Sequence, residues 1–393
     1  MNNSKATDEV IPKEMWERLS ETEKDNEAIS RKSLTYFQDA WRRLRQNKLA
    51  MVGLVVVILL ILIAVFGPFF SKYSYSDQTL EYASLTPKLD LHKISDNSFV
   101  HLANGLRLYE VTKKGEVLQF LSPIEQNLTQ KLKVYEVDGN KVILDFSQKP
   151  FKLLNENKEQ YSYYKKVWNK TYILGSDDLG RDMLTRVIHG ARISLLIAFI
   201  ATFVNFFIGI LYGGIAGYAG GRIDNIMMRI VDIISTIPLM LYVILLMVVL
   251  GSGLKPIIIA LGSVFWVNMA RIVRGQVLSL KEQEFVLAAK TIGASHFRIL
   301  IRHLLPNAMG PIIVSMMMMI PTAIFVEAFL SFIGLGVSAP KASWGTLAND
   351  ALGALRSYPH QLFSPAIAIC ITMLAFNFLG DGLRDALDPR LRK

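Results

Sequence analysis

Charge-free apolar runs constrain this chain more than any other feature of its sequence. A helix needs roughly 20 apolar residues to cross the hydrocarbon core of a bilayer. Six runs without an acidic or basic residue approach or exceed this length, and they cover residues 49–71, 193–221, 233–254, 256–270, 304–326 and 357–380. The fourth run is only 15 residues long, so it must borrow flanking residues to span. We therefore predict an all-α polytopic membrane protein with six transmembrane helices.

The overall composition agrees with this class. Hydrophobic residues make up 51% of the chain and charged residues only 19%, whereas about 25% of a soluble domain is charged. A disordered chain and a wholly soluble one are excluded. The formal net charge of +10 would also suit a nucleic-acid-binding protein. Because the basic residues flank the apolar runs, we read the charge as membrane topology and expect no nucleic-acid partner.

The positions of Lys and Arg predict the orientation. If both termini are cytoplasmic, the inner flanks hold most of the basic residues near the spans, whereas the two short outer loops hold only Lys255, Lys341 and Arg356. Cytoplasmic loops carry this excess in membrane proteins. Three arginines just before the second run oppose the rule, but they end a long outer loop, and long loops translocate largely regardless of charge.

Four regions follow from these assignments. They are a cytoplasmic tail with an amphipathic helix (1–48), the first transmembrane helix (49–71), an extracytoplasmic insertion (72–171) and a core with the remaining helices (172–393). The tail has a polar stretch over 1–30 without the apolar core of a cleaved leader. Leu34, Phe37, Trp41 and Leu44 then recur at helical spacing among arginines. This pattern indicates an interfacial helix on membrane lipid, or else a helix packed on other protein.

The insertion between the first two spans predicts a mixed α/β unit. Residues 131–137 and 141–146 alternate partly in polarity and flank Asp138-Gly139-Asn140. This arrangement is typical of a β-hairpin. At this size the unit is marginal as an independent fold, so we expect it to lean on a neighbour.

The inner loop over residues 271–305 carries the most informative pattern. Ala288 and Ala289 are paired small residues, Gly293 permits a turn, and Leu305-Pro306 opens the next span. The residues predict a short helix, a glycine turn and a second helix. Two alanines give a low-profile surface that suits docking on another protein, and the alternative is an ordinary amphipathic loop.

This stretch resembles the cytoplasmic coupling loop of ABC importer permeases. The family pattern is Glu-Ala-Ala, three residues, Gly, nine residues, Ile, one residue and Leu-Pro. It falls here on Leu287, Ala288, Ala289, Gly293, His303, Leu305 and Pro306. Leu287 replaces the Glu and His303 replaces the Ile, and Arg-His-x-Leu-Pro-Asn is similar to the peptide-importer branch. Glu284 opens the same stretch.

Three further segments resemble the C-type permeases of oligopeptide, dipeptide and nickel importers. They are residues 39–54, 174–195 and 327–345, in the family's order, while 72–171 lies outside the resemblance. The resemblance implies a second permease subunit, two ABC ATPase subunits and an extracytoplasmic solute-binding protein in a bacterial cell membrane. For the insertion we hypothesise separately that it is a docking platform for the binding protein or a brace for the partner permease, the alternative being a spacer.

Four glycines predict close helix packing in the second span. Gly209, Gly213, Gly217 and Gly221 are spaced four apart and would share one helix face. Loosened backbone packing near a pore is the alternative.

Polar residues at membrane depth are candidates for a pathway or gate. Asp232 and Glu327 are the two acidic candidates. The alternatives are an ion pair of Asp232 with Arg229 or Arg222, and a structural cap or pair for Glu327. Three amides are expected to join helices by hydrogen bonds, with substrate contact as the alternative: Asn205, Asn268 and Asn377.

Catalytic and cofactor patterns are missing from the sequence. The six histidines form no His-x-x-x-His or Glu-x-x-His pair, and a single cysteine, Cys370, allows no disulfide framework. No Gly-x-x-x-x-Gly-Lys-Ser/Thr motif occurs, so ATP and Mg²⁺ are expected on partner subunits rather than on this chain.

We therefore predict a non-enzymatic permease subunit of a peptide importer, with ATP hydrolysis on other chains. A nickel or other small-solute importer is the alternative within the class. An ion-coupled secondary transporter and a membrane-anchored receptor are alternatives of other classes. The secondary transporter would need discontinuous helices in inverted halves.

Overall fold

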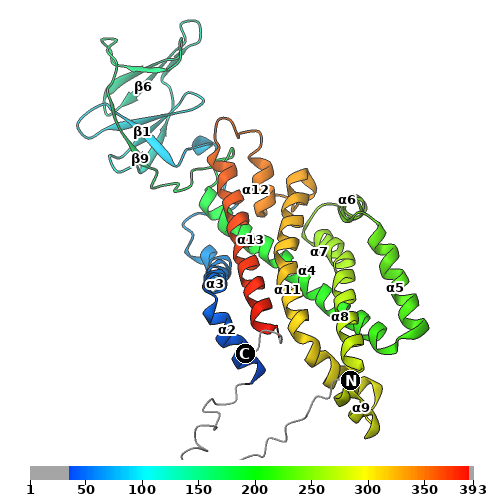
Figure 1. Cartoon of the computed structure of the whole chain (residues 1–393). Helices are drawn as coiled ribbons and strands as arrows, with labels where there is room; N and C mark the ends of the chain where they lie inside the picture. Colours follow the sequence, from blue (N-terminus) through cyan, green and yellow to red (C-terminus); the bar gives the residue numbers. More distant parts are fainter. Residues whose placement is uncertain (1–34, 389–393) are drawn as a thin grey trace, which may run out of the picture.

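The computed structural model describes residues 35–388 and shows a helical body with a β-rich unit at one end (Figure 1). The predicted polar tail over residues 1–30, together with Leu34, lies outside the described residues. Twelve α-helices are described: α2 (Tyr36–Gln46), α3 (Lys48–Phe70), α4 (Met183–Ala219), α5 (Gly221–Thr236), α6 (Leu239–Leu250), α7 (Leu254–Val264), α8 (Trp266–Lys281), α9 (Glu284–Thr291), α10 (His296–Arg298), α11 (Leu305–Leu330), α12 (Trp344–Asp350) and α13 (His360–Leu387).

Five stretches among the described residues are long and apolar enough to cross a membrane. They are Lys48–Phe70, Met183–Ala219, Leu254–Lys281, His296–Leu335 and His360–Leu387. The bent pair of α5 and α6 makes a sixth candidate if the two count as one span. The fourth predicted run does borrow flanking residues, since α7 and α8 together extend it to Lys281.

The third predicted span is not a straight helix. α5 and α6 meet at 83° across Ile237 and Pro238. Proline has no N–H to donate and disfavours helical conformation at the residue before it, so the helix breaks there. The apolar run over 233–254 contained this proline, but the angle of the break depends on packing that the run does not encode.

The second predicted span also differs at both ends. α4 begins ten residues before the apolar run, where the Asp182 side chain accepts a hydrogen bond from the Thr185 N–H at 2.8 Å. The helix ends at Ala219 because Gly220 and Gly221 both have positive φ, 65° and 55°. A left-handed backbone is easy only for glycine, so these two residues turn the chain into α5.

The insertion contains two antiparallel sheets. Their strands are β1 (Lys88–Lys93), β2 (Phe99–Ala103), β3 (Arg107–Val111), β4 (Val117–Leu121), β5 (Glu125–Asn127), β6 (Leu132–Val137), β7 (Asn140–Asp145), β8 (Lys152–Leu154) and β9 (Tyr163–Trp168). The orders are β4-β3-β2-β1-β9 and β5-β6-β7-β8. A short 3₁₀ turn, Leu80–Tyr82, precedes them.

The predicted hairpin is confirmed. β6 and β7 pair from Leu132 with Asp145 to Val137 with Asn140, which leaves Asp138 and Gly139 as the two turn residues. Both have positive φ, 50° and 74°. This is the type I′ geometry that matches the twist of a hairpin.

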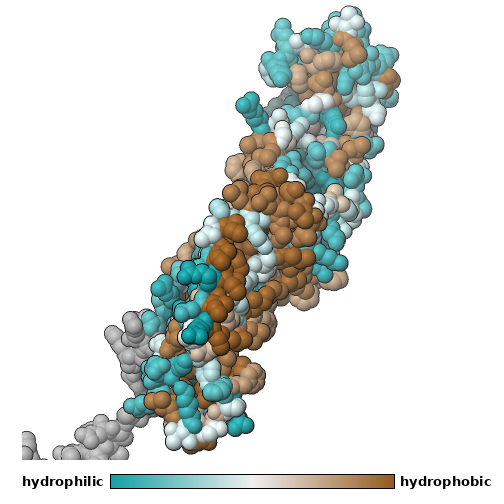
Figure 2. Space-filling view, turned by 90° about the vertical axis from the view of Figure 1, so that its right-hand side faces the viewer, coloured by the Kyte–Doolittle hydropathy of each residue, from teal (hydrophilic) through white to brown (hydrophobic). Residues whose placement is uncertain are grey.

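The helical body has an apolar band between its two ends. Figure 2 shows brown surface over the middle of the molecule. On α5 the exposed large apolar residues are Ile223, Ile226, Ile230 and Ile233, and on α6 they are Leu241, Leu245, Val248, Val249 and Leu250. A band of this kind suits contact with lipid or another membrane chain.

The helix α2 packs on α13 and also exposes an aromatic side chain. Leu44 is buried, and both it and Ala50 approach Gly382 of α13. Trp41 is 43% exposed, with the Arg45 guanidinium 4.9 Å from its ring centre. The start of α2, the end of α13 and α9 lie at the end of the body opposite the insertion (Figure 1).

Candidate functional site

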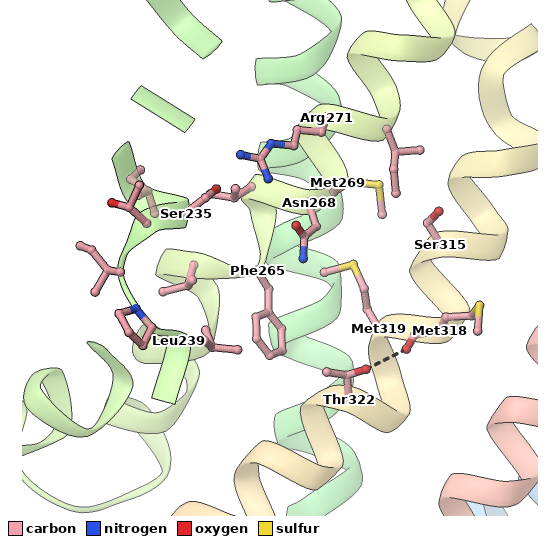
Figure 3. Close-up of a pocket in the computed structure, with 17 residues that line it drawn as sticks. Ser235, Leu239, Phe265, Asn268, Met269, Arg271, Ser315, Met318, Met319 and Thr322 are labelled. Carbon is pink, nitrogen blue, oxygen red and sulfur yellow. Dashed lines mark hydrogen bonds between the residues drawn. The ribbon is translucent and has the colours of Figure 1, made fainter. Parts of the chain in front are cut away.

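A cavity of about 630 Å³ lies where α5 and α6 break apart. Helices α8 and α11 supply its other walls (Figure 3). The lining is Ile234, Ser235, Thr236, Ile237, Pro238, Leu239, Val264, Phe265, Val267, Asn268, Met269, Arg271, Ile272, Ser315, Met318, Met319 and Thr322. Concave sites of this size, mostly apolar with a few polar groups, are typical ligand sites.

The polar groups of the cavity fall into two kinds. Thr322 and Ser315 donate their hydroxyl hydrogens to backbone carbonyls of α11, at 3.2 Å to Met318 and 2.9 Å to Pro311. Asn268 is exposed, and its amide makes no hydrogen bond within residues 35–388. The prediction of Asn268 as a helix–helix link therefore differs from the structure, which places it on the cavity wall.

Asn205 does link helices, since its amide reaches the carbonyls of Ala201 and Leu261.

Asp232 lies beside the cavity, paired with a residue that the sequence did not single out. Its carboxylate is 3.0 Å from the Arg271 guanidinium, and within the described residues it forms no ion pair with Arg222 or Arg229, the partners that the alternative named. Both side chains are about half exposed, 55% for Asp232 and 42% for Arg271. The pair contributes little to stability at this exposure, so it remains open to exchange with a charged solute.

Glu327 lies away from this cavity, in a buried network. Ser194 of α4 and Ser331 each donate a hydrogen bond to its carboxyl group at 2.8 Å. The Ser343 hydroxyl lies 3.3 Å from that of Ser331, and Ser343 also caps α12. Glu327 is fully buried. The network fastens α4, α11 and α12 together, which matches the structural alternative stated for this residue.

The glycine face of α4 packs against α8 at three of its four positions. A Cβ added at Gly209 would meet the Met269 side chain at 2.5 Å, and one at Gly217 would meet the Arg274 carbonyl oxygen at 2.9 Å. A Cβ at Gly213 would overlap the Ala270 carbonyl oxygen. Gly221 does not share this face, since it begins α5 and an added Cβ would meet nothing within 4 Å.

Gly213→Ala is expected to destabilise the chain by about 1–3 kcal/mol, because the new methyl group forces the two helix backbones apart. Gly214→Ala is the matched control, since its added Cβ would lie at 3.6 Å from the Leu300 side chain, an ordinary contact. The measurement is the melting temperature of each purified full-length variant in mild detergent. Equal melting temperatures for the two variants would contradict the packing assignment.

An ion pair that the sequence did not point to fastens α5 to α8. The Arg274 guanidinium donates two hydrogen bonds to the Asp224 carboxylate, at 2.5 and 2.6 Å. Asp224 is buried, with 8% of its side chain exposed. Bidentate pairs of this kind fix geometry as well as charge. This pair holds one wall of the cavity against another.

The predicted coupling loop forms a short helix at the end of the body opposite the insertion. α9 ends at Thr291, and Gly293, two residues later, closes a Schellman motif with its φ of 79°. In that motif the Gly293 N–H donates to the Lys290 carbonyl and the Ala294 N–H to the Ala289 carbonyl, both at 3.0 Å. The glycine turn predicted from the sequence is confirmed.

Two faces of this segment differ in burial. Val286 and Ala289 pack into a core with Ile299 and Leu304, next to the N-terminus of α11. The outward side is exposed and carries both charged and apolar side chains. We call its apolar residues the α9 patch, and they are Phe285, Leu287, Ala288, Ile292 and Phe297. Ile292 is 83% exposed and Phe297 74%.

The other predicted loop residues surround this patch. Glu284 and Pro306 are exposed and Leu305 is half-buried. Phe285, Ile292 and Phe297 were not predicted as docking residues, although large apolar residues in a loop outside the membrane are a signal for a contact surface.

Charged residues cluster around the N-terminus of α4, at the end of the helical body near the insertion. Arg181 pairs with Asp177 at 2.6 Å, and Arg186 lies 3.4 Å from both Asp177 and Asp350. Burial raises the pKa of Asp350, and the nearby arginines partly offset that rise. The three arginines that opposed the charge rule thus include two that are paired and buried.

Comparison with known proteins identifies the family. Residues 209–393 match the binding-protein-dependent transport system inner membrane component, and residues 35–87 match the N-terminal TM domain of oligopeptide transport permease C. The oligopeptide transport system permease protein OppC of Bacillus subtilis (strain 168) is 45% identical over 98% of this chain and 99% of its own length.

Two dipeptide transport system permease proteins, both named DppC, are also similar. The one from Bacillus subtilis (strain 168) is 42% identical over 98% of this chain and 95% of its own length. The one from Lactococcus lactis subsp. cremoris (strain MG1363) is 38% identical over 93% of each chain. Because these alignments cover nearly the whole chain, insertion included, the protein belongs to the family of binding-protein-dependent transport system inner membrane components.

Proposed function

We propose that this chain is the permease subunit of an ATP-driven importer of oligopeptides or dipeptides, and that it forms one half of a heterodimeric pore. The names of its full-length relatives support the substrate class and favour peptides over nickel. The broken α5–α6 pair is a feature that an ion-coupled transporter would also have, but the family membership supports the ATP-driven class.

The observation that carries the proposal is the cavity between the α5–α6 break, α8 and α11. Met318 and Met319 offer adaptable thioether surface, which suits side chains of varied shape. Asn268 can donate to and accept from a peptide backbone, and Arg271 and Asp232 can each pair with a peptide terminus. The cavity would be this subunit's half of the pathway.

The proposal assigns the remaining parts of the chain to partners. The α9 patch docks one of two ABC ATPase subunits, which carry ATP and Mg²⁺, and a second permease completes the pore. The insertion receives an extracytoplasmic solute-binding protein or braces the partner permease. Both termini are cytoplasmic, on the α9 side of a bacterial cell membrane, as the Lys and Arg distribution favours.

The test uses cysteine labelling of the assembled importer. Cys370 is the single cysteine of this chain, so Cys370→Ser leaves the chain itself without a thiol before the new cysteine is introduced. Met318→Cys is expected to react with a maleimide, to lose most peptide uptake when modified, and to be protected by excess peptide. Ile371→Cys on α13, exposed to a similar degree but away from the cavity, is the control. Full uptake after complete labelling at Met318→Cys would overturn the pathway assignment.

A further inference from the structure

A second cavity, of about 670 Å³, lies between the insertion and the first turns of α13. This cavity is separate from the one proposed as the peptide pathway. Its walls come from β1, β2 and β9 on one side and from Ser357 to Ile367 on the other. Figure 1 shows the insertion beside this end of α13. Because α13 is a candidate membrane span that starts at His360, the cavity lies at the level where the helix enters the bilayer.

The wall on the insertion side is cationic and aromatic. Lys88 lies over the Trp168 ring, with its Nζ 4.6 Å from the ring centre. Within the described chain no carboxylate lies within ion-pair distance of Lys88, whereas Lys166 is 3.6 Å from Asp90. Trp168 is 62% exposed. Tryptophan beside lysine is typical of the membrane–water interface.

The remaining ionisable groups in the wall leave this positive charge uncompensated. Asp90 is the one carboxylate among the lining residues, and it already faces Lys166. His101 is buried, and its Nδ1 lies 3.1 Å from the Asp90 carbonyl oxygen. Burial lowers the pKa of His101, so the ring is neutral near pH 7 and Lys88 supplies the excess charge.

The wall on the α13 side is apolar and continues into the membrane band. Phe363 is 58% exposed and Ile367 54%, and both line the cavity. Ile371 and Leu374 extend the same exposed strip farther along α13. The cavity therefore joins a cationic upper edge to an apolar strip that runs into the bilayer, as a molecule with an anionic head and acyl chains requires.

We propose that this cavity binds an anionic phospholipid of the outer leaflet, with the phosphate at Lys88 and Lys166 and an acyl chain along Phe363 and Ile367. The lipid would fill the gap between the insertion and the membrane and would hold the insertion at a fixed angle. The proposal rests on the membrane orientation given above but is independent of the transported substrate.

Quenching of Trp168 by brominated lipid tests the proposal on the full chain in vesicles. The Trp168 signal is the difference between wild type and Trp168→Phe. Vesicles of phosphatidylcholine carry a small, equal fraction of brominated phosphatidylglycerol or brominated phosphatidylcholine. Attraction of an anionic lipid by one lysine corresponds to about fivefold enrichment, so phosphatidylglycerol is expected to quench Trp168 several-fold more.

Two variants locate the effect. Lys88→Gln with Lys166→Gln is expected to abolish the preference for phosphatidylglycerol, whereas Lys141→Gln, on the other sheet and paired with Glu156, is expected to keep it. Equal quenching by the two brominated lipids in wild type would overturn the proposal. Absence of quenching by either would also overturn it, because it would mean that protein covers the cavity. Peptide uptake, measured with the assembled importer in vesicles of the same lipids, reports separately on the proposed function.

Discussion

Ile292→Glu is expected to release the ATPase subunits from the purified importer while the second permease stays bound. Ile292 is 83% exposed at the end of α9 and lies in the apolar α9 patch. A carboxylate placed in an apolar interface must lose its hydration without gaining a partner. At about 2 kcal/mol this weakens docking roughly 30-fold. The fold of the chain should not change, because Ile292 packs on nothing in the described core.

The measurement is co-purification from the native membrane in mild detergent, with ATPase activity and peptide uptake assayed in parallel. Leu118→Glu is the matched control, since Leu118 is 55% exposed on β4 of the insertion. We expect the control to retain the ATPases. If Ile292→Glu also retained them and supported normal uptake, the α9 patch would not be the docking surface. If the chain purified alone and showed ion-coupled uptake, the ATP-driven assignment would fail.

Arg274→Leu is expected to destabilise the chain by about 3–5 kcal/mol, because it leaves the Asp224 carboxylate buried without its partner. The wall formed by α5 would then separate from α8, and peptide uptake would fall with stability. Replacing both partners by leucine removes the uncompensated charge, so Asp224→Leu with Arg274→Leu is expected to recover most of the loss. The measurement is the melting temperature of the purified chain together with uptake by the assembled importer.

Arg271→Leu is the comparison variant, because Arg271 lies about one helical turn from Arg274 on α8 but forms an exposed ion pair. The Arg271–Asp232 pair is about half exposed, so its loss is expected to cost only about 0.2–1 kcal/mol. Arg271 lines the cavity, however, so uptake should fall while the melting temperature stays near that of wild type. Equal loss of stability for Arg271→Leu and Arg274→Leu would show that burial does not separate the two pairs as described.

Local patterns predicted the parts of this protein that depend on neighbours in sequence. The Asp138-Gly139 turn and the Gly293 turn are set by backbone conformations that few residues adopt, so the residue types alone reveal them. The apolar runs marked the membrane helices because an unsatisfied backbone in lipid is costly for any chain. The family resemblance pointed to the segment that we propose as the coupling loop, since that motif is also a local pattern.

Partners across the fold could not be read in the same way. Asp224 and Arg274 are fifty residues apart, and Glu327 meets Ser194 from 133 residues away. No spacing rule connects such residues, because helix packing alone brings them together. The cavity at the α5–α6 break has the same origin: Pro238 shows that a break is favoured, but its angle and the walls opposite it come from α8 and α11.

The sequence by itself determined that this chain crosses a membrane, where its hairpin and glycine turns fall, and that it resembles a permease. The membrane spans and the turns follow from hydration of apolar runs and from backbone sterics, which act residue by residue, whereas the resemblance rests on matched motifs. Tertiary structure alone decided that Asn268 faces a cavity, that Glu327 is buried and joins helices through hydrogen bonds, and that Ile292 is exposed. A side chain's role in these cases depends on which distant helix lies against it, because burial and pairing are properties of the packed fold.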